Sequence, residues 1–480
     1  MLPALIRRPG RHIDSRKRER GATMALVALS MVGVVSMAAL SVDIGSLYQA
    51  KSEAQRSADA AALAAARVLS VSGMTGDPTN STGYWSNACA TATAAAQAIG
   101  NQNSVGGAVP TSVTVTFSAN DGSGCGSTGA VDFGVNPLVT VKVAQSRLRT
   151  FFARVFGLFN SNYSTVSVSG SATAEAFNPS YSGNFDSASA GAGNLIPVQP
   201  RCVKPWIVPD RDPMHPAGCT NATCQKLVQA DGSITNPGIT LNGAAGGGVI
   251  GEQFNLVPDC NTSGLCNSAT PPFNLIAQAN VTTTPPSTPN LQYLPALVSN
   301  ASPAASSCAV GDYQQSIAGC DTTTAYQCGV PSTVATTQTL VNLNENPYGP
   351  TGDTGVATQC LIHESGSGLG NGQDLLVDSS FPFQIQAGSG NPLGVSGSTI
   401  TSSTSIVSLP IYESTSPLPP GQQQAVTIIG FLQVFINSVN ADGSLNVTVL
   451  NLSGCSNIST STSPFVTGTS PVPIRLITPP

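Results

Sequence analysis

Charged side chains are scarce in this sequence. Asp, Glu, Lys and Arg make up 9% of its 480 residues, whereas about 25% is usual in globular proteins. Uncharged polar residues, Gly and Pro take their place, and this composition suits a solvated surface protein better than a cytosolic enzyme. Hydrophobic residues still account for 41% of the chain, so it can bury a core and charge-driven disorder is not expected.

Basic residues are rarer still beyond the first 20 positions. Seven of the 19 Lys and Arg residues precede position 21, which leaves 12 basic against 22 acidic residues in the rest of the chain, a net charge of about −10. A surface with that balance lacks the basic patches that bind nucleic acid. No nucleic-acid partner is therefore expected.

Catalytic and metal-binding signatures are missing as well. The sequence contains no G-x-S-x-G, no H-E-x-x-H and no G-x-x-x-x-G-K-[ST] motif. No C-x-x-C pair occurs, and neither His215 nor His363 stands beside a Cys pair, which argues against zinc. Asp210 and Asp212 lie in PWIVPDRDPMHP, which we interpret as a turn because further calcium ligands are missing. We therefore expect that the protein is not an enzyme and that it has no catalytic, cofactor-binding or metal-binding residues.

One long apolar run is present. No residue from 21 to 42 is charged, and 22 residues at about 1.5 Å each form about 33 Å of helix, enough to span a bilayer. The basic tail of residues 1–20 precedes this run, so we expect the tail in the cytoplasm and residues 43–480 on the exported side. A cleavable secretory signal is the alternative, but 22 residues is long for its apolar segment.

Residues 43–70 continue the helical pattern without a break, as an Ala-rich stalk helix. Four alanines recur on one face at helical spacing, namely Ala54, Ala58, Ala61 and Ala65. Because this segment carries few charges, packing is favoured over a bare, solvated helix. The partner of this Ala face is either the chain's own sheet or the same helix of a neighbouring subunit, so self-association stays open.

The run from residue 18 to 69 resembles the N-terminal segment of the TadE/TadG-like Flp pilus-assembly proteins of the tight-adherence (Tad) system. The matching features are Arg20-Gly21 before the apolar helix, Asp43 at its outer end, Tyr48, and Gln55 leading into the Ala-rich run. The resemblance implies a single-pass protein of the bacterial inner membrane. It further implies a role, without catalysis, beside other Tad/Flp components or pilin in assembling an adhesive pilus.

The same resemblance bears on proteolytic processing. Cleaved pilins are cut after a Gly that follows basic residues, and they carry Glu at the fifth mature position. Here Arg20-Gly21 imitates that junction, but Leu26 occupies the fifth position. Retention of the anchor with its basic tail is therefore expected.

Residues 71–177 are expected to form a small α+β domain with an antiparallel sheet against helices. The alternating segments 111–118, 138–143 and 164–175 predict strands, and the Ala-rich segment 85–99 predicts a helix. A further helix over 148–159 is expected to turn four side chains into the core, namely Phe152, Val155, Phe156 and Phe159.

A Ser/Gly/Asn-rich linker over 178–194 is expected to lead into a Cys/Pro-rich, loop-rich β region over 195–480. Its clearest strands are 405–412, 425–436 and 445–450, which predict a three-stranded meander with the middle strand buried. Asp378 is a further candidate metal ligand, because it begins a sequence similar to the D-x-S-x-S motif of von Willebrand A domains. Pro382 occupies the place of the second Ser, so we expect no such domain.

All 12 Cys lie between Cys89 and Cys455, on the expected exported side. Such an even number predicts disulfides formed in an oxidising compartment. Cys89 is expected to pair with Cys125, since the other ten belong to the distal region, where closure of Cys260 with Cys266 is one open alternative. Two functions agree with these features: a structural or assembly component of a pilus, and an anchored adhesin whose distal loops bind a surface.

Overall fold

The computed structural model describes the following residues: 16–71, 82–118, 137–148, 152, 166–176, 178, 198–215, 225–235, 248–258, 288–298, 309–321, 324, 326, 339–342, 352–379, 382–414, 423–455, 466–468 and 470–477. The chain forms two compact units. The first comprises residues 1–57, 102–112 and 143–170, and the second comprises 58–101, 113–142 and 171–480. Several helices and strands contribute residues to both units.

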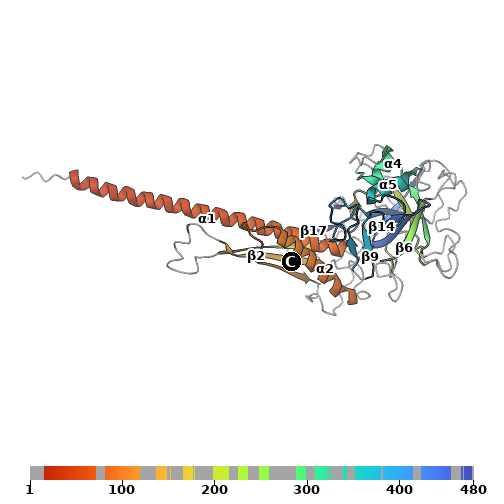
Figure 1. Ribbon diagram of the computed structural model, residues 1–480, viewed down its shortest axis with the longest axis horizontal. Coiled ribbons are helices and arrows are strands. Elements are labelled where there is room, and N and C mark those ends of the chain that lie inside the picture. Colours follow the sequence, from red (N-terminus) through yellow and green to blue (C-terminus); the bar gives the residue numbers. More distant parts are fainter. Residues whose placement is uncertain are drawn as a thin grey trace, which may run out of the picture. The chain divides into compact units, whose positions relative to one another are not determined.

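A single helix, α1 (Arg16–Val71), covers both the apolar run and the Ala-rich segment, and it is the long red and orange helix of Figure 1. The sequence explains its length, because the segment contains no Pro and is rich in Ala and other helix formers. The long apolar helix expected from the sequence is therefore confirmed.

The Ala face of α1 is buried by the chain itself. Ala54, Ala58, Ala61 and Ala65 all have no exposed surface. In the first unit, β3 (Val166–Ala176) passes directly over the helix at Gly170. A Cβ on that glycine would lie 2.5 Å from the carbonyl oxygen of Ala54, so only a glycine permits this approach.

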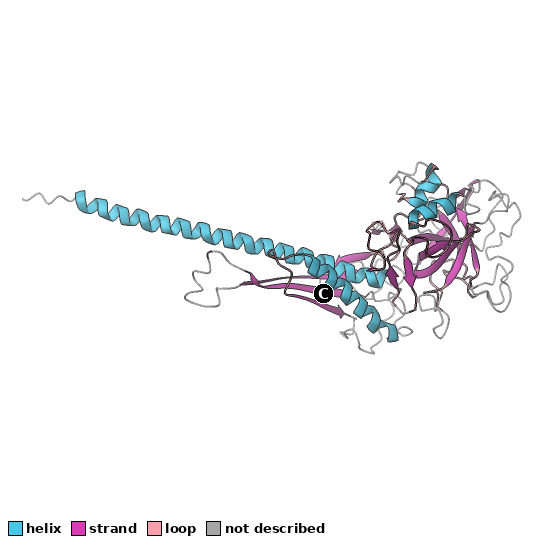
Figure 2. Cartoon of the chain, viewed as in Figure 1, coloured by secondary structure: helices cyan, strands magenta, loops and turns pink. Residues whose placement is uncertain are grey.

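A four-stranded sheet has the order β1-β2-β3-β17, drawn in magenta among the strands of Figure 2. The three predicted strands are confirmed as β1 (Ser112–Ser118), β2 (Leu138–Leu148) and β3. The predicted helix is α2 (Thr82–Gln102), whose alanines 88, 92 and 96 are buried. The fourth strand, β17 (Ile474–Ile477), pairs antiparallel with β3 although it comes from the end of the chain.

The expectation of a helix over 148–159 is wrong at its first residue. Leu148 ends strand β2, which is five residues longer than expected. Phe152 lies in a bend and is 48% exposed, so it does not fill the core as predicted. The other residues of that segment lie outside the described part of the chain.

The distal region contains a closed barrel with the strand order β12-β14-β15-β6-β7-β5. The predicted meander is confirmed, because β14 pairs antiparallel with β12 and with β15. Pairs β6/β7 and β5/β12 are parallel. The bounds are β5 (Trp206–Pro209), β6 (Gln253–Pro258), β7 (Asn290–Pro295), β12 (Ile406–Tyr412), β14 (Ile428–Val439) and β15 (Leu445–Gly454).

Strand β14 is the central buried strand expected from its apolar run, since all of its side chains except Asn437 are buried. The predicted strand over 425–436 is split at Thr427, however. Its first part belongs to β13 (Gln423–Val426), which pairs with β8 (Thr339–Asn342) in a separate two-stranded sheet.

Short elements surround the barrel. Helices α4 (Gly311–Ala318) and α5 (Asp353–Ile362) contact each other, and α5 also contacts β14. The remaining strands are β4 (Val198–Pro200), β9 (Leu375–Val377), β10 (Gln384–Gln386), β11 (Thr399–Ile400) and β16 (Val466–Gly468).

Disulfides are present as the cysteine pattern predicts. Cys202 and Cys320 are joined across 118 residues, and the other described cysteines, Cys89, Cys360 and Cys455, are disulfide-bonded as well. The expected partner of Cys89, Cys125, lies outside the described residues, as do Cys260 and Cys266. The expected linker is described only at Asn178, which is buried.

Candidate functional site

The first candidate is the N-terminal part of α1. Its large apolar side chains are exposed from Met24 to Val42, with between 48% and 78% of each side chain accessible. Within the described residues this is the helix that is long and apolar enough to cross a membrane. Exposed apolar side chains along these 19 residues match the lipid-facing surface of a spanning helix.

Asp43 marks the end of this apolar surface. Its side chain is only 2% exposed, whereas the apolar residues before it face outward. One carboxylate oxygen, Oδ2, accepts a hydrogen bond of 2.9 Å from the backbone N–H of Phe152. Asp43 therefore binds a residue more than 100 positions later in the chain to the helix. The sequence indicated Asp43 only through the family pattern.

A cleft of about 680 Å³ lies beside the next turns of α1, within the first unit. It is lined by Ser46, Ala50 and Glu53 of the helix, by the turn at Gly106, and by Arg147 of β2. Glu53 accepts the backbone N–H of Gly106 at 2.8 Å, and this contact holds the turn on the helix. Tyr48, another residue of the family pattern, is 73% exposed.

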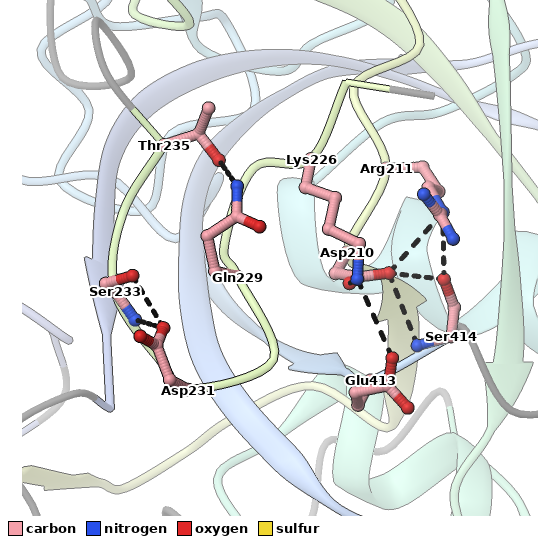
Figure 3. Close-up of polar contacts among 9 residues, drawn as sticks. All are labelled: Asp210, Arg211, Lys226, Gln229, Asp231, Ser233, Thr235, Glu413 and Ser414. Carbon is pink, nitrogen blue, oxygen red and sulfur yellow. Dashed lines mark hydrogen bonds and ion pairs between the residues drawn. The ribbon is translucent and has the colours of Figure 1, made fainter. Parts of the chain in front are cut away.

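A second group of polar residues lies where β5 and β12 pair. Asp210 is fully buried, and Lys226 Nζ lies 2.7 Å from its Oδ2. Ser414 donates its hydroxyl and its backbone N–H to Asp210 Oδ1, and Arg211 Nε donates to the Ser414 hydroxyl at 3.2 Å. Figure 3 shows these side chains converging on Asp210. Asp210 is therefore paired within its own chain.

Asp212 belongs to a different cluster, with His215 and Glu252. The ligand atoms of these three residues all lie within 4.8 Å of one another. His215 Nδ1 is 2.8 Å from Asp212 Oδ2 and 3.2 Å from Glu252 Oε1. Hydrogen bonding to Asp212 and to Glu252 raises the pKa of His215 to about 10, and burial raises the pKa of Glu252.

Two further candidates from the sequence are His363 and Asp378. Within the described residues, neither belongs to a cluster of three His, Cys, Asp or Glu side chains that could hold a metal ion. His363 caps the C-terminus of α5 in a left-handed conformation. Asp378 is exposed and accepts a hydrogen bond of 2.9 Å from Gln253 Nε2.

Sequence reasoning did not find the cluster of Asp212, His215 and Glu252. The spacing of Asp212 and His215 is visible in the sequence, but two residues do not define a site. Glu252 follows 37 positions later, after a stretch without a recognisable motif, and only the barrel brings it to the other two.

Comparison with known families matches one segment of the chain. Residues 21–68 match the model of the Tad family, described as Flp pilus-assembly TadE/G-like. This confirms the resemblance identified from the same residues, and it covers about a tenth of the chain. No curated protein and no solved structure matches.

Proposed function

We propose that this chain is a membrane-anchored, exported, non-catalytic protein that serves as a structural or assembly component of a Tad/Flp-type pilus. The proposal rests on one observation: the family match and the exposed apolar surface fall on the same helix, α1. The segment that matches the Tad family includes the whole exposed apolar surface from Met24 to Val42. It also includes the Ala face that packs against the chain itself.

The proposed orientation places residues 1–20 in the cytoplasm and residues 43–480 in the periplasm or outside the cell. The basic tail supports it through the positive-inside rule. The bonded cysteines support it independently, since disulfides such as Cys202–Cys320 persist in oxidising compartments. In this arrangement the bacterial inner membrane holds the anchor.

The proposed partners are other Tad/Flp pilus-assembly components or pilin. The buried Ala face of α1 is already occupied by the chain's own residues. Contacts with another subunit, including a second copy of this chain, would therefore use other faces of the helix. Tyr48 is exposed, and a cleft lies beside Glu53, so both are accessible to such a partner.

Deletion of the coding sequence in the native bacterium tests this proposal. Pili per cell are counted by electron microscopy, and attachment to a surface is measured on the same cultures. The assembly role predicts that pilus number falls in the deletion strain and returns on complementation. Normal pili with lost attachment would instead support the alternative of an anchored adhesin, and normal values of both would contradict the proposal.

A further inference from the structure

The structure holds one group of side chains that the proposed function does not use. This group lies beside the barrel and consists of Asp212, His215 and Glu252. Asp212 and His215 follow the end of β5, and Glu252 directly precedes β6. Asp212 and Glu252 have no exposed surface, whereas 30% of the His215 side chain is exposed. The two carboxylates are thus buried, whereas the imidazole is partly open to solvent.

Glu252 is the residue that needs an explanation. Both of its carboxylate oxygens are buried, and within the described residues its ion-pair partner is the His215 ring, 3.2 Å from Oε1. That ring nitrogen, Nδ1, carries at most one hydrogen and lies closer to Asp212, at 2.8 Å, so two buried carboxylates share one donor. Such an arrangement is costly, and buried charges are normally fully paired or bound to a metal.

The surrounding backbone holds the acids in place. Asp212 Oδ1 accepts the backbone N–H groups of Met214 and His215, at 2.9 and 3.2 Å, which leaves Oδ2 directed at the cluster. On the opposite side, Val449 of β15 donates its N–H to the carbonyl of Glu252 and accepts the N–H of Gly251. Such outer contacts orient metal ligands in proteins of known function.

We propose that Asp212, His215 and Glu252 bind one divalent transition-metal ion, Zn²⁺ being the best match. Imidazole and carboxylate ligands bind Zn²⁺ at about 2.0–2.2 Å, so neighbouring ligand atoms of a tetrahedral site lie about 3.3 Å apart. The separations of 2.8 and 3.2 Å from His215 Nδ1 are close to that value. Calcium and magnesium fit less well, because they prefer six or more oxygen ligands.

The ligand set leaves one position of the tetrahedron to solvent. Three protein ligands with an open fourth position distinguish this site from a closed structural zinc site, which has four protein ligands. The His215 side chain is 30% exposed, so solvent can reach the cluster. Lys226 and Arg211 contact Asp210 and Ser414 instead of this cluster.

Metal binding by the full-length protein tests the inference. Untagged protein in detergent micelles, with its disulfides intact, is stripped with EDTA, dialysed and titrated with ZnCl2 in a calorimeter. We expect one Zn²⁺ per chain. Glu252→Gln removes a ligand oxygen at nearly constant volume, and it should weaken binding by about 10-fold or more. Wild-type protein that takes up no Zn²⁺ would overturn the inference.

Asp231→Asn is the matched control. Asp231 is exposed and makes the same kind of turn as Asp212, since its Oδ1 accepts the N–H and hydroxyl of Ser233 (Figure 3). This variant should bind Zn²⁺ like the wild type. Equal binding by wild type and Glu252→Gln would place the ion elsewhere and contradict the site.

Co²⁺ replaces Zn²⁺ in a second measurement that reports the ligand type. Nitrogen and oxygen ligands predict weak visible bands without the intense near-ultraviolet absorption of a cobalt–thiolate bond. Such an absorption would assign the ion to cysteine and overturn the inference. If Glu252→Gln fails to fold, His215→Asn serves in its place, because that side chain is partly exposed and its loss removes the only nitrogen ligand.

Discussion

Lys204 shows how a single residue is altered by its surroundings. Its side chain is 4% exposed, and Nζ donates to the carbonyl oxygens of Ile317 and Gly319 at 2.6 and 2.7 Å. These carbonyls lie at the C-terminal end of α4, where a cation is favoured. Burial lowers the pKa of Lys204 to about 7. The contacts satisfy the ammonium group, so we assign it a structural role.

The lowered pKa of Lys204 predicts a pH-dependent stability. Between pH 7 and about pH 10 the unfolded chain keeps the lysine protonated while the folded chain releases the proton, so the free energy of unfolding should rise with pH. The raised pKa of His215 acts in the opposite direction over this pH range, so the effect of Lys204 is measured as a difference between wild type and Lys204→Met. In thermal unfolding followed by fluorescence of the buried Trp206, the melting temperature of the wild type minus that of the variant should increase from pH 7 to pH 9. A difference that does not change with pH would contradict the assignment.

The sequence identified some residues of functional interest, but not their contacts. Asp43 was found through its place in the family pattern, whereas its hydrogen bond to the N–H of Phe152 depends on a chain reversal that no local pattern encodes. Asp210 stands beside Arg211 in the sequence, but the nearer cation in the structure is Lys226, at 2.7 Å against 3.6 Å.

At the scale of elements, the contact between β3 and α1 depends on Gly170. Gly170→Ala would place a methyl group 2.5 Å from the backbone of Ala54 and Gln55, which forces the strand off the helix. We expect a loss of about 2 kcal/mol or more in the free energy of unfolding, measured by thermal unfolding with circular dichroism.

Gly45→Ala is the matched control for this contact. Gly45 lies in α1, and a Cβ added there meets no atom within 4 Å. Since Ala is the better helix former, this variant should be unchanged or more stable by up to about 1 kcal/mol. Equal melting temperatures for Gly170→Ala and the wild type would show that β3 does not lie against α1.

Elements with a strong local pattern were predicted well from the sequence. The alternation of apolar and polar residues located β1 and β3 within two residues at each end, and the apolar run located β14 within three. The break at Thr427 was missed because β13 turns to a partner strand, β8, some 80 residues earlier. Barrel closure was missed for the same reason, since β5 and β12 are joined by pairing between distant segments.

At the scale of the whole molecule, the proposed role depends on an anchor that stays attached to the chain. The helix begins at Arg16, so it includes four of the seven basic residues of the tail and the Arg20-Gly21 junction. With Leu26 where cleaved pilins have Glu, we predict that the mature protein keeps its basic tail. N-terminal sequencing of protein isolated from membranes should therefore find no start at Ala22. A start at Ala22 would mean that the chain is processed like a pilin.

The central claim is that membrane anchoring by α1 is needed for a role in pilus assembly. It is tested by complementing the deletion strain with two forms of the protein: the full chain, and a form in which a cleavable secretory signal replaces residues 1–42. With both forms exported in equal amounts, we predict that the full chain restores the number of pili per cell and the released form does not. Full restoration of pili by the released form would contradict the account.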